Sequence, residues 1–284
     1  MNDELVRRLL HRPTGVNKYD FGHVLVVGGS PGMVGAPLLA GEAALRAGAG
    51  LVTIAAAAHV TDRLERRVRE IMTLTLPADP AETARTAAEF AAARRVTAVV
   101  VGPGLRAEAA PLCRALVPVV RVPVVLDAGG LLAYRGHISA LGELARASPG
   151  IIATPHTGEY EKLTDSTLPA ARNEIKRAVA DFAQRSGLIV VLKGHHSLIA
   201  RPDGTVRENT TGNPGLATAG TGDVLTGIIA GLLAQGVDAA QAAEAGVYLH
   251  GLAGDSARTA KTEAGMVASD VIAYLPEAWR SLER

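Results

Sequence analysis

The chain has 284 residues, of which 48% are hydrophobic and 20% charged, and its formal net charge is +1. This length is enough for one large core or two small ones, and the interspersed charges exclude the basic footprint of a protein that binds nucleic acid or an anionic membrane. Because Cys113 is the only cysteine, an intrachain disulfide and a thiolate metal cluster are excluded as well.

The N-terminal segment, residues 1–15, contains no apolar signal core. The longest apolar stretch follows Asp223, and it is too short and too often broken by glycine to span a bilayer. We therefore expect a cytoplasmic protein without membrane association. No internal repeat, low-complexity tract or linker divides the sequence, so we expect a single domain over residues 1–284.

Short runs of aliphatic and β-branched residues alternate with alanine-rich stretches along the chain. The predicted strands cover residues 23–29, 51–57, 98–104, 123–130, 150–156 and 188–194. This alternation predicts an α/β fold with a central, mostly parallel sheet covered by helices on both faces. Two further extended stretches flank the PDG sequence at residues 202–204, which predicts a hairpin at the edge of the sheet.

Several of these predicted strands end in glycine, aspartate, histidine or lysine. In open α/β sheets the ligand crevice lies beyond the carboxyl ends of the strands. We therefore expect these residues to converge on one rim of the sheet. Asp127 is one of them, and from the sequence alone it could either support the site or cap the helix that follows.

Two common phosphate-binding motifs do not fit the sequence. The segment GGSPGMVG, residues 28–35, follows a predicted strand but lacks the G-x-G-x-x-G spacing. The P-loop pattern G-x-x-x-x-G-K-[ST] does not occur. Both a Rossmann dehydrogenase and a P-loop kinase are therefore weak hypotheses.

The segment AGTGD, residues 219–223, precedes apolar residues at helical spacing, which predicts a helix N-terminus at this point. Unpaired N–H groups at residues 221–224 would face outward there and offer a site for a phosphate. A glycine-rich turn with Asp223 as a helix cap is the alternative. A helix N-terminus also lowers the pKa of a carboxylate, which argues partly against Asp223 as a strong base.

Six motifs, taken in order, resemble the NAD(P)H-hydrate dehydratase family of the ribokinase-like superfamily. They lie at residues 23–55, 100–105, 124–131, 154–163, 190–200 and 209–227. The sequence departs from the family pattern at residues 18–22, where a glycine often follows the lysine, and at Thr218 and Ala219, where lysine and glycine are common. The resemblance implies a ribokinase-like fold over nearly the whole chain.

The reaction implied by the resemblance is the repair of hydrated nicotinamide dinucleotides. The S epimers of NADHX and NADPHX would be dehydrated to NADH and NADPH, with ADP rather than ATP as phosphoryl donor, Mg²⁺ as cofactor, and AMP and phosphate as products. Because hydroxide is a poor leaving group, a kinase-like transfer to the ring hydroxyl would precede the elimination. A homotetramer is the family expectation. We expect no fused epimerase domain before the first predicted strand, so epimerisation is expected to need a separate NAD(P)HX epimerase.

The resemblance also assigns roles to residues of the late motifs. Asp223 would accept the hydroxyl proton and orient its oxygen. An anion hole for the transferred phosphoryl group would be formed by Gly220, Thr221 and Gly222. The AMP part of the nucleotide would contact Gly222 and the KGHHS segment, Lys193, Gly194, His195, His196 and Ser197. Because alternation along a strand sends neighbouring side chains to opposite faces, at most one of the two histidines is expected to point at the ligand.

The hydrated dinucleotide would contact Ala36, Gly104, His156 and Asp223. Glu159 would help to order phosphate or magnesium, and the metal ligands are unassigned. The H-x-x-E pair of His156 and Glu159 could instead bind a transition metal, although the spacing indicates no third ligand.

Other interpretations stay open from the sequence. A ribokinase-like kinase of a small alcohol, of the thiazole or pyrimidine type, would use the same glycine-rich site but release a stable phosphate ester. A catalytically silent nucleotide-binding protein is a further alternative. At the level of single residues, Lys193 could be a surface lysine whose stem covers apolar neighbours.

Overall fold

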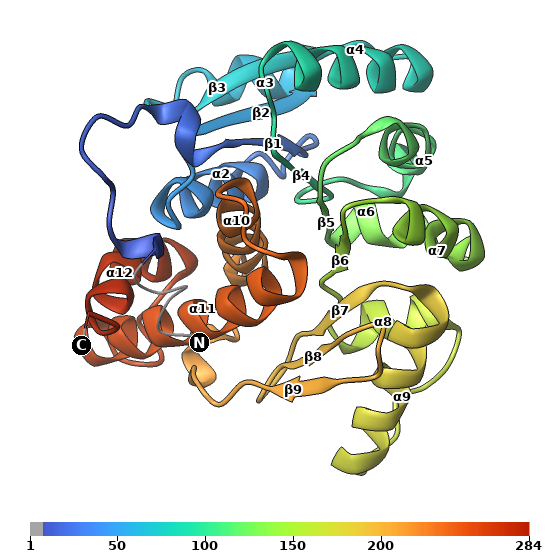
Figure 1. Ribbon diagram of the computed structural model, residues 1–284, viewed down its shortest axis with the longest axis vertical. Helices are drawn as coiled ribbons and strands as arrows, with labels where there is room; N and C mark the ends of the chain where they lie inside the picture. The colour runs from blue at the N-terminus through green and yellow to red at the C-terminus, as the bar shows by residue number, and fades with distance from the viewer. Residues whose placement is uncertain (1–7, 284) are drawn as a thin grey trace.

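The computed structural model describes residues 8–283, through which a nine-stranded sheet runs in the order β3-β2-β1-β4-β5-β6-β7-β8-β9 (Figure 1). The strands are β1 (His23–Val27), β2 (Leu51–Ala57), β3 (Met72–Leu76), β4 (Ala98–Val101), β5 (Val124–Leu126), β6 (Ile151–Ala153), β7 (Ile189–Leu192), β8 (Leu198–Ala200) and β9 (Val206–Glu208). Strands β1 to β7 pair in parallel, and β8 and β9 complete the sheet as antiparallel neighbours. The predicted parallel sheet and its edge hairpin are confirmed.

Helices cover both faces of this sheet, as the sequence predicts (Figure 1). One face carries α2 (Gly35–Arg46), α3 (Ala58–Leu64), α10 (Thr221–Ala234), α11 (Ala239–Lys261) and α12 (Ala268–Arg280). The other carries α4 (Pro80–Ala93), α5 (Ala110–Leu116), α6 (Ala128–Leu132), α7 (Ile138–Ala147), α8 (Thr157–Thr164) and α9 (Arg172–Ser186). Short 3₁₀ turns lie in the connections: η1 (Lys18–Phe21), η2 (Ala107–Ala109), η3 (Val117–Val119) and η4 (Pro214–Leu216).

Two hydrophobic cores form because successive side chains of a strand point to opposite faces of the sheet. On β1, Val24 and Val26 belong to the core beneath α2 and α10. Leu25 and Val27 belong to the core beneath α4 to α9. Both faces of the strand are therefore buried, which explains why the predicted strands are nearly continuous apolar runs.

Helices α2 and α10 pack closely because two glycines of α10 meet the backbone of α2. A Cβ atom at Gly227 would lie 2.1 Å from the carbonyl oxygen of Ala40. One at Gly231 would lie 2.6 Å from the carbonyl oxygen of Ala44. No side chain fits in these gaps, so the glycines set the distance between the two helices.

Strand β3 was not predicted from the sequence. It is an edge strand in which threonines alternate with apolar residues, and only its last residue, Leu76, is buried. The charged segment before it, residues 63–70, has a composition that predicts a solvated helix face. Helix α3 in fact ends at Leu64, and most of that segment forms the turns between α3 and β3.

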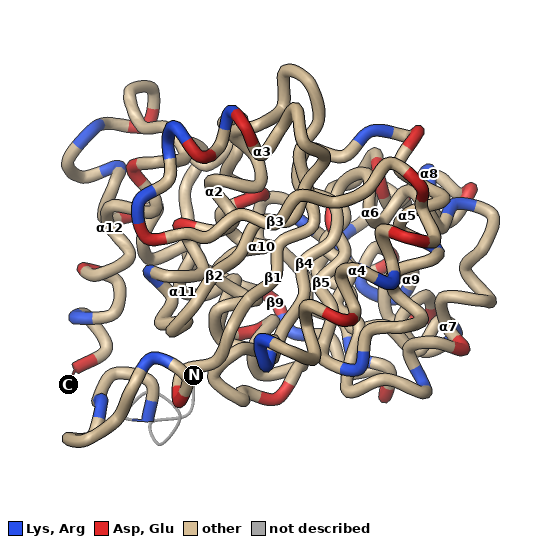
Figure 2. The backbone as a smooth tube through the Cα atoms, turned by 90° about the horizontal axis from the view of Figure 1, so that it is seen from above, with Lys and Arg blue, Asp and Glu red and all other residues tan. Residues whose placement is uncertain are grey.

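The predicted absence of a leader rests partly on residues 1–7, which lie outside the described residues. Within residues 8–283, no helix is long and apolar enough to cross a membrane. Lys and Arg are interspersed with Asp and Glu along the backbone, in agreement with the mixed charge of the sequence (Figure 2).

Candidate active site

The carboxyl ends of the parallel strands form one rim, and the predicted site residues follow these ends. The strand order reverses between β1 and β4, because β2 and β3 lie on one side of β1 and the later strands on the other. Such a switch point is where open α/β sheets place a ligand crevice. On the same rim, Asp127 follows β5, and an isolated parallel bridge joins His156 and Lys193 after β6 and β7.

Gly104 and Ala36 lie against each other at this switch point. Gly104 follows β4 with a φ of +71°, and Ala36 is in the first turn of α2, after β1. A Cβ atom at Gly104 would lie 2.5 Å from the carbonyl oxygen of Met33 and 3.3 Å from Cβ of Ala36. The structure thus brings together two of the residues predicted to contact the dinucleotide, and only glycine fits at the first.

Helix α10 begins on the same rim, at the glycine-rich segment. Gly220 precedes its first turn with a φ of +91°, which favours glycine. The Thr221 hydroxyl donates to the carbonyl oxygens of Leu216 and Thr218, at 2.8 and 2.9 Å. Asp223 lies in the first turn, and the helix has no side-chain cap. The alternative interpretation of Asp223 as a simple helix cap is therefore wrong.

Two of the amides predicted to be free are already paired. The Val224 amide donates to the carbonyl of Gly220 at 3.1 Å, and the Thr221 amide faces the carbonyl of Thr218 at 3.4 Å. Within the described part of the chain, the Gly220 and Gly222 amides meet no backbone acceptor outside the helix. The amides of Gly220 and Gly222 are thus available for the predicted anion hole, whereas the amide of Thr221 is not.

The ammonium group of Lys193 lies between two carboxylates. Its Nζ donates to Oδ1 of Asp127 at 2.8 Å and lies 3.6 Å from Oε2 of Glu159. The lysine side chain is 18% exposed, so the alternative of a surface lysine is wrong. Burial lowers the pKa of Lys193, but the carboxylates of Asp127, Glu159 and Asp223 together raise the pKa above its ordinary value, so the ammonium stays charged.

The pKa of Asp223 is raised from its ordinary value to about 7. Burial of the carboxyl group is the largest cause, and the charge of Asp127 adds to it. Lys193 lowers the pKa, and Glu159 raises it further. The expected lowering by the helix N-terminus is therefore outweighed. A carboxylate that changes protonation near neutral pH is suited to accept a proton.

His156 and Glu159 cap the N-terminus of α8 with reciprocal hydrogen bonds. Nδ1 of His156 accepts from the amides of Gly158 and Glu159, at 3.1 and 3.4 Å. Oε2 of Glu159 accepts from the His156 amide at 2.9 Å. This capping box fixes both side chains, and the imidazole stays 59% exposed on the rim. Residues 8–283 contain no group of three or more His, Cys, Asp or Glu side chains that could hold a metal ion, so nothing favours the transition-metal alternative.

A cavity of about 450 Å³ opens beside Lys193 and Gly222. All five residues of the KGHHS segment, 193–197, line it, together with the loop at residues 209–217 and parts of α10 and α11. Its volume is typical of small-molecule sites. The structure thus brings the residues predicted to contact AMP to one cavity, next to the first turn of α10.

The two histidines of this segment do not point to opposite faces, so that expectation is wrong. Strand β7 ends at Leu192, and His195 and His196 lie in the turn after it, where His196 has a φ of +54°. Their rings meet edge to face with centroids 4.0 Å apart, and both line the cavity. Strand alternation does not apply to residues in a turn.

Sequence reasoning missed three further residues of this cavity and its support. Asp255 of α11 accepts hydrogen bonds at 3.0 Å from the Gly212 amide and from the side chain of Asn213, which anchors the loop over the cavity. His250, also on α11, lines the cavity, and burial lowers its pKa to about 4. Both α11 residues lie in an unremarkable alanine-rich helix, so only Asn213, within the NTTGNPG run, carried a signal in the sequence.

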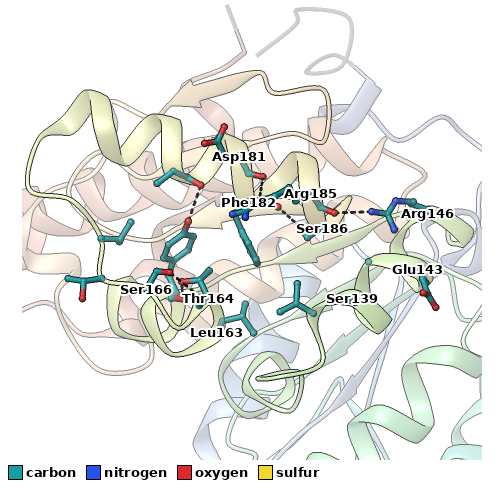
Figure 3. A pocket seen from close by; sticks show the side chains of 16 residues that line it. Ser139, Glu143, Arg146, Leu163, Thr164, Ser166, Asp181, Phe182, Arg185 and Ser186 are labelled. Atoms are coloured by element: carbon teal, nitrogen blue, oxygen red, sulfur yellow. Dashed lines mark hydrogen bonds between the residues drawn. The ribbon is translucent and has the colours of Figure 1, made fainter.

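A larger cavity, of about 570 Å³, lies between α7, α8 and α9 (Figure 3). Its wall includes Arg146 of α7, which donates to the carbonyl of Arg185 at 2.8 Å, and Tyr160 of α8, whose hydroxyl donates to the carbonyl of Ala178 at 3.0 Å. None of the residues predicted for the site lines this cavity. We therefore take the smaller cavity at the strand ends as the candidate active site.

The fold and this site define an α/β protein with a small-molecule cavity and a half-buried carboxylate, Asp223, in the first turn of α10. A family model described as NAD(P)H-hydrate dehydratase (Carb_kinase) matches residues 24–277. The chain belongs to this family.

Relatives and a solved structure agree with this membership. The bifunctional NAD(P)H-hydrate repair enzyme Nnr of Moorella thermoacetica is 42% identical over 97% of this chain and 52% of its own length. The ADP-dependent (S)-NAD(P)H-hydrate dehydratase of Neisseria meningitidis is 40% identical over 90% of this chain and 84% of its own length. The ADP/ATP-dependent NAD(P)H-hydrate dehydratase of Bacillus subtilis, co-crystallised with ATP and Mg²⁺, is 30% identical, with a TM-score of 0.77 over 99% of this chain and 98% of that one.

The chain spans about half the length of the bifunctional relatives that it matches. Its sheet order and its likeness to solved structures confirm the ribokinase-like fold expected from the resemblance.

Proposed function

We propose that the chain repairs hydrated nicotinamide dinucleotides, dehydrating the S epimers of NADHX and NADPHX to NADH and NADPH. The observation that carries the proposal is the meeting of Asp223, Lys193 and a small-molecule cavity at the start of α10, in a chain of this family. The ADP-dependent dehydratases among its relatives support ADP as the phosphoryl donor. We propose that ATP is the less suitable donor.

Asp223 takes the proton of the ring hydroxyl while the hydroxyl oxygen attacks the β-phosphorus of ADP. The bond from that phosphorus to AMP breaks, and AMP leaves. The lone pair of the ring nitrogen then expels phosphate and forms an iminium. The ring carbon next to the one that carried the phosphate loses a proton to solvent, which restores the dihydropyridine. Such transfers depend mainly on alignment and charge stabilisation. We therefore propose that the amides of Gly220 and Gly222 and the Lys193 ammonium bind the transferred phosphoryl group.

The residues present fit Mg²⁺ as a companion of the nucleotide phosphates. Both oxygens of Asp127 already accept hydrogen bonds, and residues 8–283 hold no cluster of three metal-ligating side chains. Mg²⁺ commonly uses one or two carboxylates together with substrate phosphates. We propose that the carboxylate of Glu159 is the protein ligand of the ion. When bound, the ion would neutralise part of the negative charge of the phosphates.

The remaining parts of the site follow from the same proposal. The hydrated dinucleotide contacts Ala36, Gly104 and His156, and the AMP part lies in the cavity lined by the KGHHS segment. The homotetramer, the cytoplasmic location, the separate epimerase and the single domain over residues 1–284 stay predictions.

The test uses the purified chain with the S epimer of NADHX, ADP and Mg²⁺. We expect the absorbance of NADH to return, with AMP and inorganic phosphate as products. The alternative, a kinase of a small alcohol, gives no NADH from this substrate and releases a stable phosphate ester from its own. Product analysis by chromatography separates the two.

A further inference from the structure

Asp127 is buried at the end of β5, and its side chain does not cap the helix that follows. It is 2% exposed, and α6 begins without a side-chain cap. The next residue, Ala128, has a φ of +44°, a conformation that residues other than glycine rarely adopt. Backbone strain of this kind persists where the surroundings hold a residue in place, and it gathers at functional sites.

Three donors converge on this carboxylate, one directly after β6, one directly after β7 and one in α10. Oδ1 accepts from Nζ of Lys193 at 2.8 Å and from the hydroxyl of Thr154 at 2.9 Å. Oδ2 accepts from the hydroxyl of Thr226 at 3.1 Å. Both threonines are fully buried. Asp127 therefore ties the ends of β6 and β7 to α10.

The contact with α10 places Asp127 beside the proposed proton acceptor. Thr226 lies three residues after Asp223, and residues at this spacing share one face of a helix. The charge of Asp127 acts on Asp223 accordingly, second only to burial among the causes that raise the pKa of Asp223.

The Lys193 ammonium, held by Asp127, points toward the start of α10. A Cβ atom at Gly222 would lie 3.3 Å from its Nζ. The lysine therefore directs its charge at the first turn of α10, where the transferred phosphoryl group of the proposed reaction lies.

We propose that Asp127 is a positioning residue of the repair reaction, holding Lys193 and the first turns of α10 so that ammonium, free amides and Asp223 surround the reacting phosphoryl group. This inference rests on the proposed function. It agrees with the assignment of the Lys193 ammonium to the transferred phosphoryl group rather than to the AMP part of the nucleotide. A purely structural role is a poor explanation, because a buried ion pair contributes little net stability compared with apolar residues of similar size.

The test is a double-mutant cycle with Asp127→Asn and Lys193→Met, because a residue that acts through another loses its effect when that partner is removed. In the wild-type background, we expect Asp127→Asn to raise KM for ADP and lower kcat, each roughly tenfold or more. In the Lys193→Met background, where only the contact of Asp127 with Thr226 remains to be lost, the same substitution should lower kcat/KM by a clearly smaller factor. Equal losses in both backgrounds would overturn the proposal.

The pH profile gives a second readout that a structural role would not move. The charged groups facing Asp223 are Asp127 directly after β5, Lys193 directly after β7 and Glu159 in α8. The negative charge of Asp127 raises the pKa of Asp223. Removing it should therefore move the fall of kcat on the acid side of the pH profile, its acid limb, to lower pH. Thr226→Val removes a hydrogen bond from Asp127 but keeps its charge, so it should lower kcat without shifting that limb. An unshifted limb in Asp127→Asn contradicts the inference.

If Asp127→Asn does not fold, the double variant Thr154→Val/Thr226→Val replaces it. This variant frees the carboxylate from two of its three donors, and we expect KM for ADP to rise with the acid limb in place. Unchanged KM in this variant overturns the positioning role. If the wild-type chain restores no NADH with either nucleotide, the proposed function itself has failed. Wild-type activity with no effect of these variants removes only the role of Asp127.

Discussion

The ammonium of Lys193 occupies the space beside Gly222 on the rim, where a Cβ atom at Gly222 would lie 3.3 Å from Nζ. That separation is tighter than an ordinary van der Waals contact, and Lys193 cannot simply retreat because Asp127 holds it at 2.8 Å. The side chain missing at Gly222 therefore leaves the room that the lysine occupies.

Gly222→Ala should consequently impair the reaction without unfolding the protein. We expect kcat/KM for ADP to fall roughly tenfold, since small displacements of positioning groups are costly to such transfers. The control is the same substitution with Lys193→Met, where the crowding is relieved. If Gly222→Ala lowers kcat/KM by the same factor in both backgrounds, the contact with Lys193 is not the cause.

Asp223→Asn should abolish turnover while nucleotide affinity stays within a few-fold of the wild type. The amide keeps the shape of the side chain but cannot take the hydroxyl proton, and loss of a general base typically costs about 10²- to 10⁴-fold. Equilibrium binding of ADP and stopped assays of NADH formation measure the two effects. Full activity in this variant contradicts the assigned role.

The activity should rise with pH through the region of neutrality. Asp223 has a pKa of about 7 in the folded chain, and below that pH it is protonated and cannot accept a proton. We expect kcat to fall on the acid side of about pH 7. A kcat that is flat down to pH 5 would be incompatible with Asp223 as the proton acceptor.

The same raised pKa predicts a pH-dependent stability. Between the ordinary value of 3.8 and about 7, the folded state holds a proton on Asp223 that the unfolded state has lost. The contribution of Asp223 to stability is therefore present at low pH and decreases as the pH rises through this window. Asp223→Asn should raise the Tm at pH 8 and change it little at pH 4. A lower Tm at pH 8 would contradict the cause given for the shift.

Gly227→Ala should destabilise the fold, because the added Cβ would lie 2.1 Å from the carbonyl oxygen of Ala40. Overpacking of this kind costs about 1–3 kcal/mol, and a contact with backbone is relieved less easily than one with a side chain. Gly35→Ala, in the first turn of α2 with nothing within 4 Å, is the matched control. Denaturant unfolding of both variants measures the difference, and equal stabilities would contradict the packing argument.

ADP should support faster repair than ATP. In-line transfer requires the reacting phosphorus to lie beside the α10 amides and Asp223, and the additional phosphate of ATP would displace the β-phosphorus from that place. Initial rates of NADH formation with each nucleotide, at equal Mg²⁺, measure the preference. Equal rates would contradict the donor assignment and leave the repair function intact.

The sheet and the main motifs were predictable because they follow local patterns. β1 is buried on both faces and reads as an apolar run, and the start of α10 is marked by Gly220 before helical spacing. Strand β3 escaped prediction because it lies at the edge with alternating threonines, where little apolar burial is needed. Its existence depends on pairing with β2, which no local pattern records.

The chemistry of the site was less predictable because it depends on contacts between distant segments. The helix N-terminus alone lowers the pKa of Asp223, whereas the folded chain raises it by burial and by Asp127, 96 residues earlier in the sequence. The role of Asp127 likewise depends on Lys193 and Thr226, which lie near it only after folding. The edge-to-face contact between the rings of His195 and His196 likewise depends on where β7 ends.

The glycine contacts between α10 and α2 have a mechanical consequence. Ala36 begins one of these helices and Asp223 begins the other, and the backbones interlock at Gly227 and Gly231. A hinge between the two helix starts would have to separate those interlocked backbones. The backbone contacts thus fix the distance between Ala36, the proposed dinucleotide contact, and Asp223, the proposed proton acceptor, and binding of substrates should leave this distance unchanged.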